Sequence, residues 1–600
     1  MRRFPFYGYC LAGAAAIFVG LTTLWFGLFI DDYLFLATLA GQNPLGSPTN
    51  LYVFGSGDPT DVLPLIQDGP YPWFGDPEFR VHFFRPLGSL SMALDYVLFG
   101  PSPFAFNLHS LLWHWIMCLA AMLVFRRTLP PAAGVIALLL FILDASHILP
   151  AAWWSNRHAL IAVGMGFFGV AAHLRWRQDG WRPGLPLSLA AYVTALLASE
   201  AGLCTLAYVA AYEMFGARER WRARIAALSP AAVLAITYVL LYKWAGYGAQ
   251  YSDIYVDPMS DPMGYALAAP GRFLMLAGAQ FFMAPVEAVL LRNTLAPLFV
   301  VVGAVALAVI ATVLYRLWPR FQEEERQALR WLIPGAVLAT TPTLAAIVNA
   351  RVLLAASLGG AAIIAVIIVC LWRELRTLST PPFKPLLMRA ILWLLVVLHV
   401  GVAAVAWPAQ VTLMRGGMTY LNRLIRNSEL DETRIADTQV VVFNAPDPYT
   451  SLYPLMLRSY YGEEAPRSWW NLSFAPFPHR VTRTGPREME LEVLGGELLT
   501  STMERLFRSA RRPLYAGYEM SLNGLCIKVL EMGTVGPVRM RLLFEKPPEH
   551  ERYQLLAFQN GAYRRFVPPE PGESVVLPHG FPSRRQRHSS HEATPEEDRF

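Results

Sequence analysis

Long apolar runs alternate with short polar segments along this chain from residue 8 to residue 408. A helix needs about 20 predominantly apolar residues to cross the hydrocarbon core of a bilayer, and most of these runs approach or exceed that length. We therefore expect about eleven membrane spans, at 8–30, 104–125, 132–150, 158–174, 186–199, 201–216, 226–246, 295–317, 331–350, 352–372 and 388–408. The pattern predicts an α-helical, polytopic membrane protein.

The composition agrees with this prediction. Of the 600 residues, 54% are hydrophobic and only 16% are charged, and the mean hydropathy of +0.36 lies far from that of a soluble domain. The formal net charge of +6 is small for this length, and the basic residues stand in short clusters between apolar runs. We expect no nucleic-acid partner. The five cysteines show neither a disulfide framework nor a zinc-binding spacing.

The basic clusters orient the chain in the membrane. The segments "FRRT", "LRWRQDGWR" and "ARERWRAR" all fall on the cytoplasmic side if the N-terminus is cytoplasmic. The same topology requires 271–291 to lie along the outer interface or to re-enter, because this segment contains an arginine, a proline and a glutamate. We then expect the loops 31–103 and 247–270, and everything after residue 408, on the extracytoplasmic side.

The chain changes character after residue 408. Runs such as "TQVVVFNAP", "LEVLGG", "CIKVLEMG", "VRMRLLFEK" and "YQLLAF" are separated by glycine and proline, which is typical of short strands. We expect a transmembrane domain over 1–408 and a strand-rich or mixed α/β extracytoplasmic domain over 409–583. The polar stretch 584–600 is predicted to be disordered.

Two adjacent carboxylates, Asp31 and Asp32, follow the first apolar run. Such residues are often only solvated loop positions, but burial at the rim of an apolar cavity would raise their pKa and make one of them a base. Arg85 precedes a run in which leucines and valine recur at helical spacing after Pro86. This spacing predicts an amphipathic helix on the outer leaflet, with Arg85 binding either a lipid headgroup or a phosphate or carboxylate of the site.

Further polar residues gather at the predicted outer ends of spans. Asn156, Arg157 and His158 begin the fourth span, where an outer arginine runs against the local charge bias. Glu200, in "ASEAG", lies at a depth where an unpaired carboxylate is costly, so we expect it to have a partner or a chemical role.

Arg351 lies at the junction of the ninth and tenth spans. Its guanidinium suits a lipid phosphate because it stays charged and binds two oxygens at once. A structural ion pair with Asp31 or Glu200 is the alternative.

The order of these motifs resembles the membrane part of GT-C glycosyltransferases. They are most similar to the protein O-mannosyltransferases, including the tetratricopeptide-bearing transmembrane group. The motifs are, in order, a first span ending in "DD", then "FRPLGSLSMALDYVLFG", "FNLHSLLWHW", "HILPAAWWSNRHALI", "ASEAG" and "RVLLAASLG". The likeness covers about 1–408. The tetratricopeptide array of that group is missing here, and "SEA" lacks the lysine of the related "SKE"-like motif.

The resemblance implies a membrane glycosyltransferase that uses a polyprenyl-phosphate-linked sugar and a protein, lipid or glycan acceptor. Asp31 would be the base and Asp32 its neighbour. The residues expected to contact substrate are Arg85, Asn156, Arg157, His158, Glu200 and Arg351. No metal or other cofactor is expected. We expect an inner-membrane protein whose catalytic loops and C-terminal domain face the periplasm.

Two other functions fit parts of the pattern. A non-enzymatic flippase or transporter of lipid-linked sugars would also carry aspartate and arginine residues, although spread along the spans rather than gathered at their outer ends. A scaffold for the assembly of envelope polysaccharide would keep the fold and not depend on Asp31.

Overall fold

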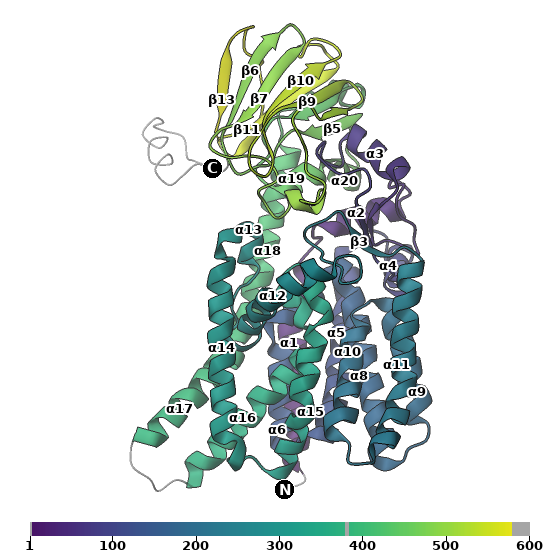
Figure 1. Ribbon diagram of the computed structural model, residues 1–600, viewed down its shortest axis with the longest axis vertical. Coiled ribbons are helices and arrows are strands. Elements are labelled where there is room, and N and C mark those ends of the chain that lie inside the picture. Colours follow the sequence, from purple (N-terminus) through teal and green to yellow (C-terminus); the bar gives the residue numbers. More distant parts are fainter. Residues whose placement is uncertain (1–2, 378–382, 579–600) are drawn as a thin grey trace, which may run out of the picture. The chain divides into compact units, whose positions relative to one another are not determined.

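The computed structural model describes residues 3–377 and 383–578 of the chain, and Figure 1 shows its helices and strands. The chain divides into two compact units. The first comprises 1–54, 81–249 and 255–416, and the second comprises 55–80, 250–254 and 417–600. The predicted disordered tail, 584–600, lies outside the described residues.

The first unit is a bundle of helices. Its members are α1 (Arg3–Leu21), α2 (Asp31–Leu39), α4 (Pro86–Phe99), α5 (Pro103–Thr128), α6 (Pro131–Leu143), α7 (Ile148–Ala152), α8 (Arg157–Asp179), α9 (Gly184–Ala198), α10 (Gly202–Ala211), α11 (Trp221–Trp244), α12 (Pro262–Phe282), α13 (Ala288–Leu291), α14 (Ala296–Leu317), α15 (Glu323–Thr340), α16 (Ser357–Thr377) and α17 (Phe383–Val396). In Figure 1, α5, α8 and α10 run side by side through the bundle, and α8 packs against both of the others. The predicted helical membrane architecture is confirmed.

The expected number of spans is not confirmed. Within the described residues, seven helices are long and apolar enough to cross a membrane, or up to eight if a bent pair counts as one span. They cover Tyr7–Trp25, Pro103–Thr128, Trp154–Asp179, Trp221–Trp244, Asn293–Arg320, Ser357–Arg376 and Leu386–Arg426, and the bent pair is Pro131–Leu143 with Ala145–Ala152. The apolar runs at 186–199, 201–216 and 331–350 coincide with helices that are shorter or carry charge, namely α9, α10 and α15.

Exposed apolar side chains lie on the outside of this bundle. On α14, Leu298, Val301, Val305 and Val309 are exposed at helical spacing, and only its opposite face is buried. Helix α4, predicted after Pro86, also exposes apolar side chains, since Leu90 and Leu94 are exposed while Ser89 and Asp95 of the same helix are buried. Apolar faces that point outward are expected where lipid is the solvent.

The second unit is strand-rich, as expected for the C-terminal part. A six-stranded antiparallel sheet has the order β13-β6-β7-β10-β9-β8, and a four-stranded sheet has the order β12-β11-β4-β5 with parallel pairing of β11, β4 and β5. The strands are β4 (Gln439–Val442), β5 (Ser468–Asn471), β6 (His479–Gly485), β7 (Glu488–Val493), β8 (Glu519–Ser521), β9 (Leu525–Met532), β10 (Pro537–Phe544), β11 (Tyr553–Gln559), β12 (Ala562–Arg565) and β13 (Ser574–Leu577). Helices α19 (Pro448–Leu452) and α20 (Pro454–Tyr460) connect β4 to β5.

The unit boundaries differ from the predicted division at residue 408. Helix α18 (Ala403–Arg426) continues past that residue because its pattern stays helical, and the division falls at 416/417. The middle of the first loop, with α3 (Pro59–Asp68), belongs to the second unit, where Trp73 Nε1 donates to the Leu472 carbonyl at 2.8 Å. Strands β1 (Val53–Ser56), β2 (Arg80–His82) and β3 (Gly248–Gln250) mark the places where the chain passes from one unit to the other.

Candidate functional site

Two residues with positive φ precede the two carboxylates at the start of α2. Gly27 has φ 89°, and Ile30, just before the helix, has φ 41°, which is unusual for a β-branched residue. Asp31 and Asp32 then occupy the first turn of α2, where the helix dipole favours negative charge. Strained backbone of this kind concentrates at functional sites.

Asp32 is the buried member of the pair. One of its carboxylate oxygens accepts from the Phe29 amide at 2.8 Å, and the other accepts from the Ser155 amide at 2.9 Å and from the Ser155 hydroxyl. Burial raises the pKa of Asp32 to about 7 against the opposing effect of these hydrogen bonds. Asp32 therefore connects α2 to the segment before α8.

Asp31 is only partly buried and interacts electrostatically with Arg351, which lies in the turn Ala350–Leu353. The Arg351 guanidinium lies over the Trp153 ring, 4.8 Å from its centroid. Burial lowers the pKa of Arg351, and the nearby Tyr255 and Asp31 oppose this shift. Among the described residues, no hydrogen bond or ion pair engages the nitrogens of this guanidinium. Arg351 keeps its donors available for an anion.

Arg85 is engaged with Glu200. Its Nε donates to one carboxylate oxygen at 2.9 Å and its Nη2 forms an ion pair with the other, while Nη1 lies 3.0 Å from His158 Nε2. The guanidinium also faces the Tyr52 ring. Burial raises the pKa of Glu200, but the charge and hydrogen bonds of Arg85 outweigh this effect and lower it. The structure thus gives Glu200 the partner that its depth required.

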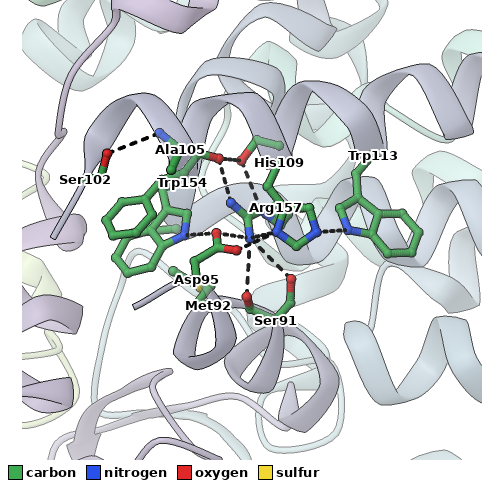
Figure 2. Close-up of polar contacts among 12 residues, drawn as sticks. Ser91, Met92, Asp95, Ser102, Ala105, His109, Trp113, Trp154 and Arg157 are labelled. Carbon is green, nitrogen blue, oxygen red and sulfur yellow. Dashed lines mark hydrogen bonds and ion pairs between the residues drawn. The ribbon is translucent and has the colours of Figure 1, made fainter. Parts of the chain in front are cut away.

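Arg157 belongs to a separate, closed cluster, which Figure 2 shows. Its Nη1 lies 2.5 Å from Asp95 Oδ2, and both side chains are at most 1% exposed. His109 Nε2 accepts from Trp113 at 3.1 Å, which leaves the proton on Nδ1, 2.6 Å from Asp95 Oδ1 and 2.9 Å from Arg157 Nη1. Trp154 also donates to Asp95.

The remaining nitrogens of Arg157 bond to α5. Nε donates to the Ser110 hydroxyl at 3.1 Å, and Nη2 donates to the Phe106 carbonyl at 2.6 Å. These partners and Asp95 occupy every nitrogen of the guanidinium. The contact of Arg157 with donor phosphate stays a prediction, and the geometry gives this residue a role in holding α4, α5 and α8 together.

The structure brings Asp31, Asp32 and Arg351 together with Arg85, His158 and Glu200 in the first unit. Asn156 is buried, and within the described part of the chain its Nδ2 has no hydrogen-bond partner. No group of three or more metal-ligating side chains occurs among the described residues.

Sequence reasoning missed two residues of this site, Ser155 and Tyr52, and one residue of the separate cluster, Asp95. Ser155 holds Asp32, Tyr52 donates to the Ser155 carbonyl at 2.8 Å and packs on His158, and Asp95 neutralises Arg157. Asp95 had a usable signal, because it is the single charge in an otherwise apolar helix. Ser155 and Tyr52 had none, since their roles depend on long-range packing.

No protein-family model matches this chain, and no curated protein matches it either. Among solved structures, ArnT from Cupriavidus metallidurans in the apo state is 14% identical with a TM-score of 0.39, and the match covers 75% of this chain and 84% of that one. ArnT bound to undecaprenyl phosphate is 15% identical with a TM-score of 0.37, covering 77% and 89%. An Archaeoglobus fulgidus oligosaccharyltransferase is 13% identical with a TM-score of 0.37, covering 76% and 64%. At these values the likeness carries no argument about activity, and the resemblance to O-mannosyltransferases stays a prediction.

Proposed function

We propose that this protein is a membrane glycosyltransferase that transfers a sugar from a polyprenyl-phosphate-linked donor to an acceptor on the extracytoplasmic side. The observation that carries the proposal is the Arg351 guanidinium, which is half-buried within electrostatic range of Asp31 and has no hydrogen-bond partner among the described residues. A site with an available cation next to a carboxylate suits a reaction that releases a phosphate and takes up a proton.

Each residue has a separate task in this mechanism. Asp31 accepts the proton of the acceptor hydroxyl while the oxygen of that hydroxyl attacks C1 of the sugar. The bond from C1 to the phosphate oxygen breaks, and Arg351 stabilises the negative charge that develops on the leaving polyprenyl phosphate. Direct displacement inverts the configuration at C1.

The surrounding residues hold these two groups in place. Asp32 ties the first turn of α2 to Ser155, and Trp153, two residues before Ser155, supports the Arg351 guanidinium. Its indole Nε1 also donates to the Phe29 carbonyl at 2.9 Å, so one short segment contacts both sides of the site. Such preorganisation lowers the entropy cost of aligning donor and acceptor.

A transfer assay tests the proposal. Membranes that contain wild-type protein or the Asp31→Asn variant are supplied with a panel of radiolabelled polyprenyl-phosphate sugars, and transfer of the sugar is measured. Asp61→Asn is the matched control, because Asp61 is exposed on α3 and belongs to the second unit. We expect transfer by the wild type and by the control, and transfer slowed by about 10²-fold or more in a well-folded Asp31→Asn variant. Equal transfer by Asp31→Asn excludes Asp31 as the base. Absence of transfer from every donor favours the transporter or scaffold.

A further inference from the structure

Four aromatic side chains form a closed group in the first unit, here named the four-ring cluster. Its members are Phe84, Tyr238, Tyr242 and Tyr247. Going round the group, the ring centroids are 6.4 Å apart for Phe84 and Tyr238, 5.7 Å for Tyr238 and Tyr242, 5.5 Å for Tyr242 and Tyr247, and 5.1 Å for Tyr247 and Phe84. Each ring therefore contacts two others, and all four side chains are half-buried.

The cluster adjoins the ion pair of the candidate site. Phe84 directly precedes Arg85, and the Tyr238 and Tyr242 hydroxyls both interact electrostatically with Glu200. Glu200 remains 35% exposed at its side chain although it pairs with Arg85. A carboxylate with spare acceptor positions thus lies within electrostatic range of two of the four rings, Tyr238 and Tyr242.

The Tyr238 hydroxyl is buried, and within the described part of the chain it has no hydrogen-bond partner. Buried polar atoms in native structures nearly always have a partner, so an unpaired hydroxyl points to a ligand or to water that completes it. Tyrosines at a membrane interface are common by themselves. Interface preference does not account for a buried hydroxyl next to a carboxylate, because an interface tyrosine keeps its hydroxyl in water.

We propose that the four-ring cluster and Glu200 form the subsite for the sugar ring of the lipid-linked donor, an inference that rests on the proposed function. The aromatic faces pack against the C–H face of the sugar. The Glu200 carboxylate accepts hydrogen bonds from sugar hydroxyls, and the Tyr238 hydroxyl bonds to another. The apolar prenyl chain is the less suitable occupant, since it offers no partner to a carboxylate or to a buried hydroxyl.

Binding measured without turnover tests the subsite. The full-length protein in nanodiscs is titrated with polyprenyl phosphate alone and with a panel of the same lipid carrying single sugars, and each Kd is determined. The variants are Tyr238→Phe, which removes only the hydroxyl, and Tyr242→Ala, which removes a ring. Tyr315→Phe and Tyr315→Ala are matched controls, because Tyr315 is 79% exposed on α14.

We expect at least one glycosylated lipid to bind the wild type about tenfold more tightly than the bare lipid phosphate, as one or two charge-assisted hydrogen bonds would give. Tyr238→Phe and Tyr242→Ala should lose this gain while the Kd of the bare lipid stays unchanged, and both Tyr315 variants should keep it.

Three results would overturn the inference in distinguishable ways. If both variants keep the gain, the four-ring cluster does not bind the sugar, and the proposed function stands. If Tyr242→Ala weakens the bare lipid as much as the glycosylated one, the cluster binds the prenyl chain. If the wild type binds no lipid phosphate at all, the proposed function fails, and the subsite fails with it.

Discussion

Two arginines of the first unit, Arg157 and Arg351, were expected to serve the same purpose, and the structure places them in opposite surroundings. Arg157 is 0% exposed at its side chain, and every nitrogen of its guanidinium has a partner. Arg351 lies over an indole ring, and among the described residues nothing hydrogen-bonds to its guanidinium. A buried arginine with all its donors used stabilises a fold, whereas one with free donors is suited to bind an anion.

The neighbouring carboxylates repeat this contrast. Asp32 accepts three hydrogen bonds and is fully buried, while Asp31, the next residue, stays partly exposed and interacts with Arg351. One residue of difference in a helix turns a side chain by about 100°, so adjacent carboxylates take different environments. We therefore expect the partly exposed Asp31 and Arg351 to take part in the chemistry. The buried Asp32 and Arg157 should only stabilise the fold.

The largest effect is expected at Asp31. Asp31→Asn removes the proposed base, and general-base catalysis contributes about 10²- to 10⁴-fold, so kcat for sugar transfer should fall by that factor. The unfolding temperature in detergent should stay within a degree or two of the wild type, because the side chain is only partly buried. A large loss of stability with kcat retained would reverse the roles of the two carboxylates.

Next in size is the effect of opening the closed cluster. Asp95→Ala leaves Arg157 buried without its counter-ion, which should lower the free energy of unfolding by about 3–5 kcal/mol. Thermal unfolding followed by size-exclusion chromatography measures this loss. The double variant Asp95→Leu with Arg157→Met should recover most of it, since apolar residues often replace a buried pair without penalty. A stable, folded Asp95→Ala protein without activity would instead show that this cluster takes part in the chemistry.

A smaller change is expected when the free cation is removed. Arg351→Gln should raise the Kd for polyprenyl phosphate by about tenfold or more, because a hydrogen bond to a charged group contributes about 1.5–3 kcal/mol. Arg218→Gln is the control, since Arg218 is exposed. An unchanged Kd for polyprenyl phosphate in Arg351→Gln would show that Arg351 does not bind the phosphate, and that other residues bind the donor lipid.

The smallest effect, counted per pH unit, concerns the pH dependence of stability. The folded pKa of Asp32 is raised to about 7, above its unfolded value of about 3.9, so the folded state binds more protons between these limits. Stability should therefore be greatest below pH 4 as far as Asp32 is concerned, and it should fall as the pH rises toward 7, by at most about 1.4 kcal/mol per pH unit. Unfolding temperatures at pH 4 to 8 measure this slope.

Asp32→Asn, which cannot ionise, should flatten the slope, and Asp61→Asn should leave it unchanged. A slope that persists in Asp32→Asn assigns the proton uptake to another group.

Much of the fold followed from patterns that repeat along the chain. The apolar runs located the long helices, the Pro86 spacing located α4, and the five short runs after residue 408 all coincide with strands, namely β4, β7, β9, β10 and β11. The number of spans did not follow, because α9, α10 and α15 are too short or too charged to count by length and composition. Local apolar content does not distinguish a buried helix from one that crosses a membrane.

The sequence by itself determined that this is a helical membrane protein with a strand-rich C-terminal part, and it identified the aspartates and arginines worth attention. Composition and periodicity suffice for this, since both depend on neighbouring residues. Only the tertiary structure decided that Arg157 pairs with Asp95, that Arg85 pairs with Glu200, and that no residue of the described ranges engages the donors of Arg351. The ion-pair partner of Arg157 lies on another helix, 62 positions away in the chain, and that of Arg85 lies between α9 and α10, 115 positions away. An ionic side chain has no fixed role until those long-range partners and its burial are known.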